Sequence, residues 1–242
     1  MKISIIINFY DKDHKCFPQI MKYLERFTFE KEIIFVDDRN DKTENIREMY
    51  KVPDQYKIVN SFENGENVGT FEARRSGVKA ATGDYVWFVD IDDEIFDYKP
   101  VFDGSDAICY NFKMNHFMNE RFKENRYFVC ATPKNYRYAY KYLLYGSLWR
   151  NNYKRETLLK AYSQIPTHKH LFYYEDMFLN GYILNNLKRI TCNTQCIYDY
   201  NMTYNYYWKE NEDKVDYMIE HSAGIAKEIL IETKKNCFIW LI

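Results

Sequence analysis

The stretch Thr82-Gly-Asp-Tyr-Val-Trp-Phe-Val-Asp-Ile-Asp-Asp-Glu94 decides the fold. Its apolar run, Tyr85 to Val89, predicts a buried strand, and strands this short and apolar usually lie inside an α/β sheet with helices on both faces. Four acids follow, interrupted only by Ile91. Because unpaired carboxylates are costly at the end of a buried strand, several of them favour a hard divalent cation, Mg²⁺ or Mn²⁺. Ligands bind outside the carboxyl ends of such strands. The stretch therefore predicts a metal-bridged phosphate site, with a solvated acidic turn as the alternative.

The rest of the first hundred residues alternates between strand and helix patterns. β-branched runs and amphipathic spacing predict strands at 3–9, 32–36 and 56–60, and helices at 17–27, 43–50 and 70–81. The connections have the usual length for parallel crossovers, and such crossovers are right-handed. We therefore expect a mostly parallel sheet flanked by helices, an α/β fold.

A second pair of acids, Asp37-Asp38, follows the strand at 32–36. Right-handed crossovers place the ends of the strands at 3–9, 32–36 and 85–89 on one side of the sheet. Asp37-Asp38 and the acids from Asp90 onward should then face the same crevice. A solvated turn does not need to recur at the same sheet edge, so the recurrence favours a binding site.

The pattern changes after Pro100. Strands are expected at 106–114, 126–130 and 189–198, and helices at 136–145, 155–162 and 177–186. An amphipathic segment follows at 212–235. We expect a nucleotide-sugar-binding half at residues 1–100, an acceptor-binding and catalytic half of the same domain at 101–205, and a C-terminal amphipathic helix at 206–242.

Composition sets limits on partners and compartment. The chain has 242 residues, a net charge of −1 and six scattered cysteines. The small net charge gives no global field for nucleic acid, and no nucleic-acid partner is expected. Scattered cysteines without a signal sequence indicate reduced thiols in a cytoplasm, and no apolar run approaches the length of a membrane span.

Four motifs in order carry a resemblance to a known family: Ser4 to Ile7, Glu32 to Asp38, Asn67 to Gly77, and Ala81 to Asp93. Over these residues the chain resembles family 2 glycosyltransferases. The resemblance implies a GT-A (nucleotide-diphosphosugar transferase) fold with a C-terminal helical acceptor region. It implies an inverting, metal-dependent enzyme that moves a sugar from a nucleotide-diphosphate donor, with UDP preferred, to a hydroxyl of a glycan or lipid-linked acceptor. The family's commonest setting is surface polysaccharide or glycolipid synthesis.

The resemblance also implies roles for the acids at 90–93. Asp92, with Asp90 or Asp93, would hold Mn²⁺ or Mg²⁺, and one of these carboxylates would contact the ribose. The metal would act as a Lewis acid on the diphosphate leaving group.

Five further residues are candidates for binding the nucleotide. Asp37 or Asp38 would accept the ring N–H of a pyrimidine, because a carboxylate only accepts hydrogen bonds. Tyr10 could stack on the base, and Arg74 could pair with phosphate or base. Arg39 stands where the family usually has Gly, and could add a phosphate contact.

Tyr174-Glu175-Asp176 resembles the family's later Glu-Asp motif. Inverting transfer needs a base for the acceptor hydroxyl. We expect Asp176 to be that base and Glu175 to position it or to bind the acceptor. Both acids could instead only cap a helix.

The remaining acceptor candidates are four residues with structural alternatives as core or surface groups: Trp149, Arg150, His168 and His170. The basic and then apolar segment Lys234 to Ile242 could dock on the inner face of a membrane, or could pack as a terminal helix or a dimer contact.

Two other functions are alternatives to the glycosyltransferase. A sugar-nucleotide nucleotidyltransferase normally has a Gly-rich loop after the first strand, and residues 10–15 contain no Gly. A non-catalytic carbohydrate-binding module would not need Asp90, Asp92, Asp93 and Asp176.

Overall fold

The computed structural model describes residues 1–10, 13–39, 45–61, 67–119, 125–129, 148–167 and 175–200. In this part of the chain, ten strands form one sheet in the order β3-β2-β1-β4-β9-β6-β10-β5. Two strands lie off this path, β7 beside β6 and β8 beside β10. Strands from both expected halves of the chain therefore share one sheet.

The first half of the sheet is parallel, as the alternating pattern predicts. Its elements are β1 (Ile3–Phe9), η1 (Asp13–Cys16), α1 (Phe17–Glu25), β2 (Lys31–Asp37), α2 (Ile46–Met49), β3 (Lys57–Asn60), α3 (Thr70–Ala80) and β4 (Tyr85–Asp90). β1 lies between β2 and β4, with Phe9 opposite Asp37 and Asn8 opposite Asp90. The two acidic strand ends therefore lie at the same edge of the sheet, about 10 Å apart across β1.

The second half of the sheet is mixed. Its elements are β5 (Glu94–Ile95), β6 (Ala107–Met114), β7 (Phe117–Asn119), β8 (Arg126–Val129), η2 (Leu148–Arg150), β9 (Asn151–Lys154), α5 (Arg155–Ser163), α6 (Glu175–Asn186) and β10 (Arg189–Tyr200). β9 runs antiparallel to both β4 and β6, and β10 runs parallel to β6. β10 also pairs antiparallel with β8 near its start and with β5 near its end. Pairing irregularities between Asn193 and Asp199 let β10 follow the curl of the sheet.

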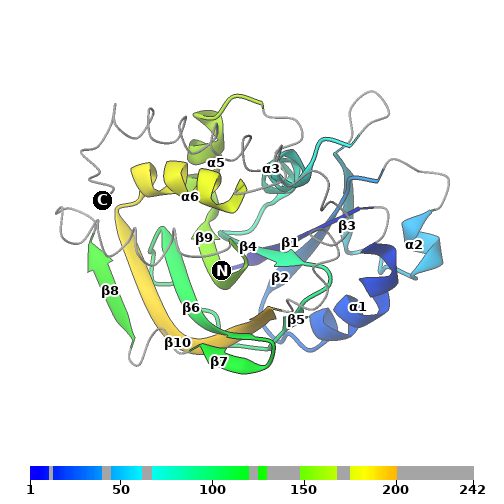
Figure 1. Cartoon of the computed structure of the whole chain (residues 1–242), viewed down its shortest axis with the longest axis horizontal. Helices are drawn as coiled ribbons and strands as arrows, with labels where there is room; N and C mark the ends of the chain where they lie inside the picture. Colours follow the sequence, from blue (N-terminus) through cyan, green and yellow to red (C-terminus); the bar gives the residue numbers. More distant parts are fainter. Residues whose placement is uncertain are drawn as a thin grey trace, which may run out of the picture.

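Each face of the sheet carries its own apolar core. On one face, Ile6 and Ile34 pack with buried residues of α3, α5 and α6. On the other face, Ile5 and Ile33 pack with α1, whose Phe17 and Leu24 are buried. Figure 1 shows α3, α5 and α6 above the sheet and α1 and α2 on its other side. Alternation along buried strands therefore supplies two cores.

The helix α3 packs closely on the sheet. Gly77 lies so near the sheet that a Cβ atom built on it would come within 2.5 Å of Ile6 Cγ2 and 3.0 Å of Val36 Cγ2. The backbone of α3 can therefore approach β1 and β2 more closely than a larger residue would permit.

β9 is the main feature that the sequence patterns do not predict. Its residues Asn151 and Asn152 are polar, yet both are buried. The amide of Asn152 donates to the hydroxyls of Tyr98 (2.6 Å) and Tyr110 (3.3 Å). These hydrogen bonds offset the cost of burying an amide, so a central strand can form here without an apolar run.

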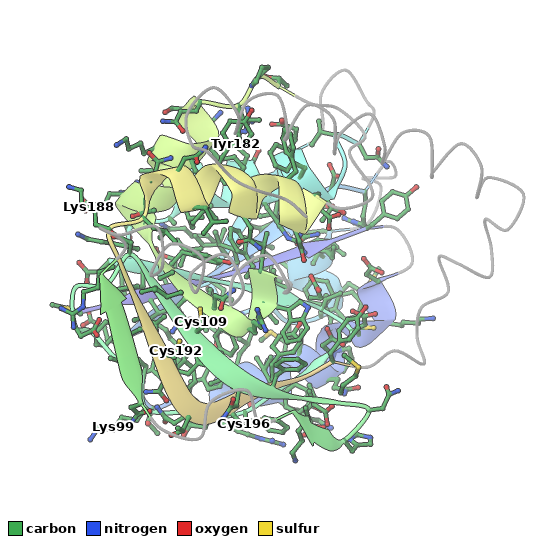
Figure 2. All side chains as sticks on the ribbon, turned by 60° about the vertical axis from the view of Figure 1, so that its left-hand side comes forward. Lys99, Cys109, Tyr182, Lys188, Cys192 and Cys196 are labelled. Atoms are coloured by element: carbon green, nitrogen blue, oxygen red, sulfur yellow. The ribbon has the colours of Figure 1, made fainter. Side chains whose placement is uncertain are left out.

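The described cysteines Cys16, Cys109, Cys192 and Cys196 carry free thiols. Cys109 and Cys192 are paired neighbours on β6 and β10, both buried, and Figure 2 shows them among the side chains that fill the space beneath α6. Among the described residues, the helices are all too short or too polar to cross a bilayer.

One carboxylate fastens the amino-terminal ends of three parallel strands. Glu32 on β2 accepts hydrogen bonds from the hydroxyl of Ser4 on β1 (2.5 Å), from the backbone N–H groups of Thr82 (2.5 Å) and Gly83 (2.9 Å), and from Lys57 Nζ (2.9 Å). Burial alone would raise the pKa of Glu32, but the bonds from Ser4, Thr82 and Lys57 lower it to about 2. The ionised form is therefore the stable one in the folded protein.

We predict that Glu32→Gln lowers the free energy of unfolding at pH 7 by about 1–3 kcal/mol, because the shift from 4.5 to about 2 is lost and solvent screens part of its effect. A lowered pKa contributes stability above the unfolded value, and the contribution disappears as the pH falls from about 5 to 2. Urea unfolding over that range measures this, with exposed Glu30→Gln as the matched control. Equal acid dependence in wild type and Glu32→Gln would contradict it.

Candidate active site

The carboxyl end of β4 presents three aspartates in three different environments. Asp92 is exposed, Asp90 is half-buried and Asp93 is buried. Asp93 accepts a hydrogen bond from the Tyr198 hydroxyl (2.8 Å), and the same hydroxyl accepts one from the backbone N–H of Asp90 (3.0 Å). Asp93 thus holds the turn against β10, whereas Asp92 faces solvent.

Arg74 is the centre of the site. It projects from α3, whose sheet-facing side is buried, and its own side chain is only 4% exposed. Its Nη2 donates to Asp90 Oδ1 (2.9 Å), and its Nη1 donates to Asp176 Oδ1 (2.6 Å) and Glu175 Oε1 (3.1 Å). A planar guanidinium carries five N–H donors that point in different directions, so it can bridge several carboxylates. The ammonium group of a Lys is a compact point charge and could not donate in the same arrangement. In this structure the Nη atoms of Arg74 bind carboxylates, and its expected contact with phosphate or base stays a prediction.

Glu175 and Asp176 form the first turn of α6. Asp176 Oδ1 contacts Arg74, and Asp176 Oδ2 accepts the backbone N–H of Leu148 (3.2 Å). Burial raises the pKa of both acids, and their mutual repulsion adds to the rise in Glu175, while Arg74 opposes it. A helix N-terminus also favours the ionised forms. Burial thus favours the protonated forms of the pair, whereas Arg74 and the helix N-terminus favour the ionised forms.

The negative potential of the site extends to η1 and to the end of β10. Asp92 keeps a solvent-accessible side, but protein atoms surround the rest of its carboxyl group; this partial desolvation, followed by Asp90 and Asp13, raises the pKa of Asp92 to about 7. Burial, followed by Asp92 and Asp13, raises the pKa of the Cys16 thiol to about 11. The acids of β4 therefore interact with Asp13 of η1, whose carboxylate also accepts the backbone N–H of Tyr10 (2.8 Å).

Tyr200, at the end of β10, senses the same group of acids. Burial raises its pKa to about 12, with further contributions from Asp90, Asp93, Asp92 and, least, Asp176. The phenol therefore lies beside the site. Three residues of the site were not predicted from the sequence: Tyr198, Tyr200 and Asp13. In the strand pattern of 189–198 the two tyrosines look like core residues. In the polar loop after β1, Asp13 looks like a turn residue.

The three aspartates after β4 fit a binding site for a divalent cation only in part. Asp92 is exposed and its charge is repelled by Asp90, so a cation bound there would relieve that repulsion. The expectation that Asp93 is a ligand finds no support, because its carboxylate is buried against Tyr198. Within the described residues, three ligand atoms closer than 4.8 Å to one another are found at Glu94, His116 and Asp199, not at Asp90, Asp92 and Asp93.

Both acids after β2 have partners within the protein. Asp38 accepts the Ser61 hydroxyl (2.7 Å) and the backbone N–H groups of Val68 and Gly69 (both 3.0 Å), which fixes the turn into α3. Asp37 accepts Arg39 Nε and Nη2, each at 3.0 Å. Asp37 also accepts the backbone N–H of Arg39 (3.1 Å), but its other two bonds come from a side chain, which can move aside more easily than the two backbone groups that hold Asp38. Asp37 is therefore the better candidate for a base N–H, and Arg39 contacts Asp37 in this structure.

The remaining predicted residues differ in exposure. Tyr10 is 41% exposed at the end of β1, as a stacking platform requires. Trp149 is 3% exposed and stacks with Tyr198 and Tyr200 at centroid distances of 4.4 and 5.3 Å. Trp149 is thus a core residue, which corrects its assignment as a sugar platform. Arg150 is likewise buried, over the ring of Phe112, which corrects its assignment as an acceptor contact.

His168 and His170 lie outside the described residues, as does the segment from Lys234 to Ile242.

Comparison with known proteins identifies the family. Residues 4–174 match glycosyl transferase family 2. The chain belongs to this family. The GT-A fold and the family expected from the motifs are thereby confirmed, and a transferase is supported over the nucleotidyltransferase and the non-catalytic module.

One curated relative and two structures of a second protein show how far the similarity extends. A cholesterol galactosyltransferase of Borreliella burgdorferi is 28% identical over 185 residues, 66% of this chain and 49% of the relative. The structure of S. aureus TarS 1–349 superposes with a TM-score of 0.63 at 24% identity, over 83% of this chain and 60% of that one. TarS 1–349 in complex with UDP-GlcNAc gives a TM-score of 0.63 at 22% identity, over 83% and 58%. The chain thus spans about half the length of the curated glycosyltransferase and about three-fifths of the TarS fragment.

We predict that Arg74→Met lowers the free energy of unfolding by about 3–5 kcal/mol, because three carboxylates lose their common cation. Urea unfolding at pH 7 measures the loss. The control is Arg26→Met, which removes an exposed guanidinium placed over the Tyr23 ring and should cost no more than about 1 kcal/mol. Similar losses in the two variants would contradict the role of Arg74 as the centre of the site.

Proposed function

We propose that the chain is an inverting, metal-dependent glycosyltransferase that moves a sugar from a UDP-sugar donor to a hydroxyl of a glycan or lipid-linked acceptor. The observation that carries the proposal is the ion-pair group in which Arg74 joins Asp90, at the acidic end of β4, to Glu175 and Asp176. It brings the donor end of the sheet and a basic carboxylate into one site. The family match supports the reaction class.

The reaction is a single displacement at the anomeric carbon. Asp176 takes the proton of the acceptor hydroxyl, the acceptor oxygen forms a bond to the anomeric carbon, and the bond to the diphosphate oxygen breaks with its electron pair. Nucleoside diphosphate leaves from the opposite face, so the configuration inverts. Asp176 is well placed to act as the base, because Arg74 and the N–H of Leu148 fix its orientation.

The donor side needs a platform, a base contact and a cation. Exposed Tyr10 would stack on the uracil, and Asp37 would accept the ring N–H once Arg39 turns away toward phosphate. Asp92, with the second oxygen of Asp90, would hold Mn²⁺ or Mg²⁺. When bound, such an ion neutralises charge on the leaving diphosphate.

The relatives support the substrate classes without naming the substrates. TarS has been solved with UDP-GlcNAc, which supports a UDP-sugar donor. The Borreliella burgdorferi relative is named a cholesterol galactosyltransferase, which supports a hydroxyl on a lipid as one kind of acceptor. We place this chain in the synthesis of a surface glycolipid or polysaccharide, at the inner face of the membrane.

A donor panel tests the proposal. We expect the protein to hydrolyse or transfer from at least one UDP-sugar with Mn²⁺ or Mg²⁺, and to lose this turnover in EDTA or as Asp92→Asn. Released nucleotide, measured by chromatography, is the readout, and exposed Asp97→Asn is the control. No metal-dependent turnover and no binding of any nucleotide sugar would overturn the proposal.

The base is tested separately. Asp176→Asn keeps the size of the side chain and one accepting oxygen, which can face Arg74, but its amide cannot take a proton. We expect it to bind UDP with unchanged affinity by calorimetry while the transfer rate falls by about 10²–10⁴-fold. Asp97→Asn again serves as the control. If Asp176→Asn transfers at the wild-type rate, the base is another residue.

A further inference from the structure

We infer that Glu94, His116 and Asp199 form a binding site for a divalent transition-metal ion such as Zn²⁺, distinct from the proposed donor site. One ligand atom from each residue lies within 4.8 Å of the others. The residues come from three places in the sheet: β5, the turn between β6 and β7, and β10. The inference does not depend on the proposed function.

The two acids face one another on neighbouring strands. Glu94 is the direct partner of Asp199 in the antiparallel pair of β5 and β10. Like charges opposite each other destabilise a strand pair, and the side chain of Asp199 is only 3% exposed. Lys113 lies opposite Asp199 on β6, and its Nζ is over the ring of Phe96, 4.9 Å from the centroid. A cation between Glu94 and Asp199 would remove the repulsion.

His116 is held in place by Asp199. Its backbone N–H donates to Asp199 Oδ1 (3.0 Å), and its Nδ1 lies 2.8 Å from Asp199 Oδ2. With Asn115 it forms the two-residue turn between Met114 and Phe117, at φ angles of 48° and 68°. Glycine is the usual residue at the second position of such a turn. A histidine there costs conformational energy, and it places an imidazole beside the two carboxylates.

The ligand chemistry favours a transition metal over Mg²⁺. An imidazole nitrogen with two carboxylate oxygens suits Zn²⁺, whereas Mg²⁺ prefers oxygen alone. Ligand atoms about 2.1 Å from a tetrahedral metal are about 3.4 Å apart; His116 Nδ1 and Asp199 Oδ2 are 2.8 Å apart, so a rotation of the exposed imidazole that moves Nδ1 by a few tenths of an ångström would admit the ion. An ion would replace the proton between these atoms. The His116 side chain is 82% exposed, so water can complete the coordination.

Such an ion would link three segments that meet beside the active site. Glu94 directly follows Asp93, whose carboxylate holds the turn after β4, and Asp199 lies between Tyr198 and Tyr200 on β10. The ion would fix β5 to β10 and to the β6–β7 turn. Its expected effect is therefore structural, and it should not require a nucleotide.

Zinc titration of the full chain tests the site. EDTA-treated wild-type protein, without nucleotide, is titrated with Zn²⁺ against a chromogenic chelator, and thermal unfolding is followed with and without Zn²⁺. His116→Gly removes the ligand while the turn keeps its preferred residue, so the variant should fold. Glu94→Gln removes the second ligand, and Asp92→Asn controls for the proposed donor-site cation.

We expect wild type and Asp92→Asn to bind one zinc equivalent that raises the melting temperature. His116→Gly and Glu94→Gln should each bind it at least about tenfold more weakly and lose the temperature shift. The site is overturned if wild type binds no zinc, if Asp92→Asn loses the same equivalent, or if either ligand variant binds zinc like wild type. Loss in His116→Gly alone would indicate binding by a single histidine, and would overturn the three-ligand site.

Discussion

The ion-pair group around Arg74 is the interaction on which the site depends. A guanidinium that is 4% exposed pays a large desolvation penalty. Three carboxylates from β4 and α6 compensate for it, and they in turn would repel one another without the cation. Neither the buried guanidinium nor the three carboxylates would be stable without the other, so α3, β4 and α6 must meet in one arrangement. The packing of α3 through Gly77 sets the position from which Arg74 reaches all three.

The parallel half of the fold could be predicted because its determinants are local. The apolar run from Tyr85 to Val89 and the β-branched run from Ile3 to Phe9 mark buried strands by themselves. β9 could not be predicted in this way. Its buried Asn151 and Asn152 are stabilised by tyrosine hydroxyls from residues distant in the chain and from within β9 itself. Such partners exist only after folding, so a polar tetrapeptide gives no strand signal.

The candidate site could be predicted at the level of which acids gather, but not of what each one does. The sequence places Asp37, Asp38, Asp90, Asp92 and Asp93 at one sheet edge, and the structure agrees. In sequence these aspartates look alike. In the structure, the carboxylates of Asp38 and Asp93 accept hydrogen bonds that fix loops, whereas Asp92 is exposed. This division depends on donors such as the Gly69 N–H and the Tyr198 hydroxyl, whose positions no periodicity reveals.

The charge balance of the site bears on the order in which ligands could bind. Asp90, Glu175 and Asp176 share one cation, Arg74. Burial raises the pKa values of Asp92, Glu175 and Asp176, and repulsion from neighbouring acids adds to each rise. A nucleotide diphosphate would add further negative charge beside Asp92. It could approach only with a cation that neutralises both, because the guanidinium of Arg74 is already engaged. The electrostatics therefore argue for binding of the donor together with its metal ion.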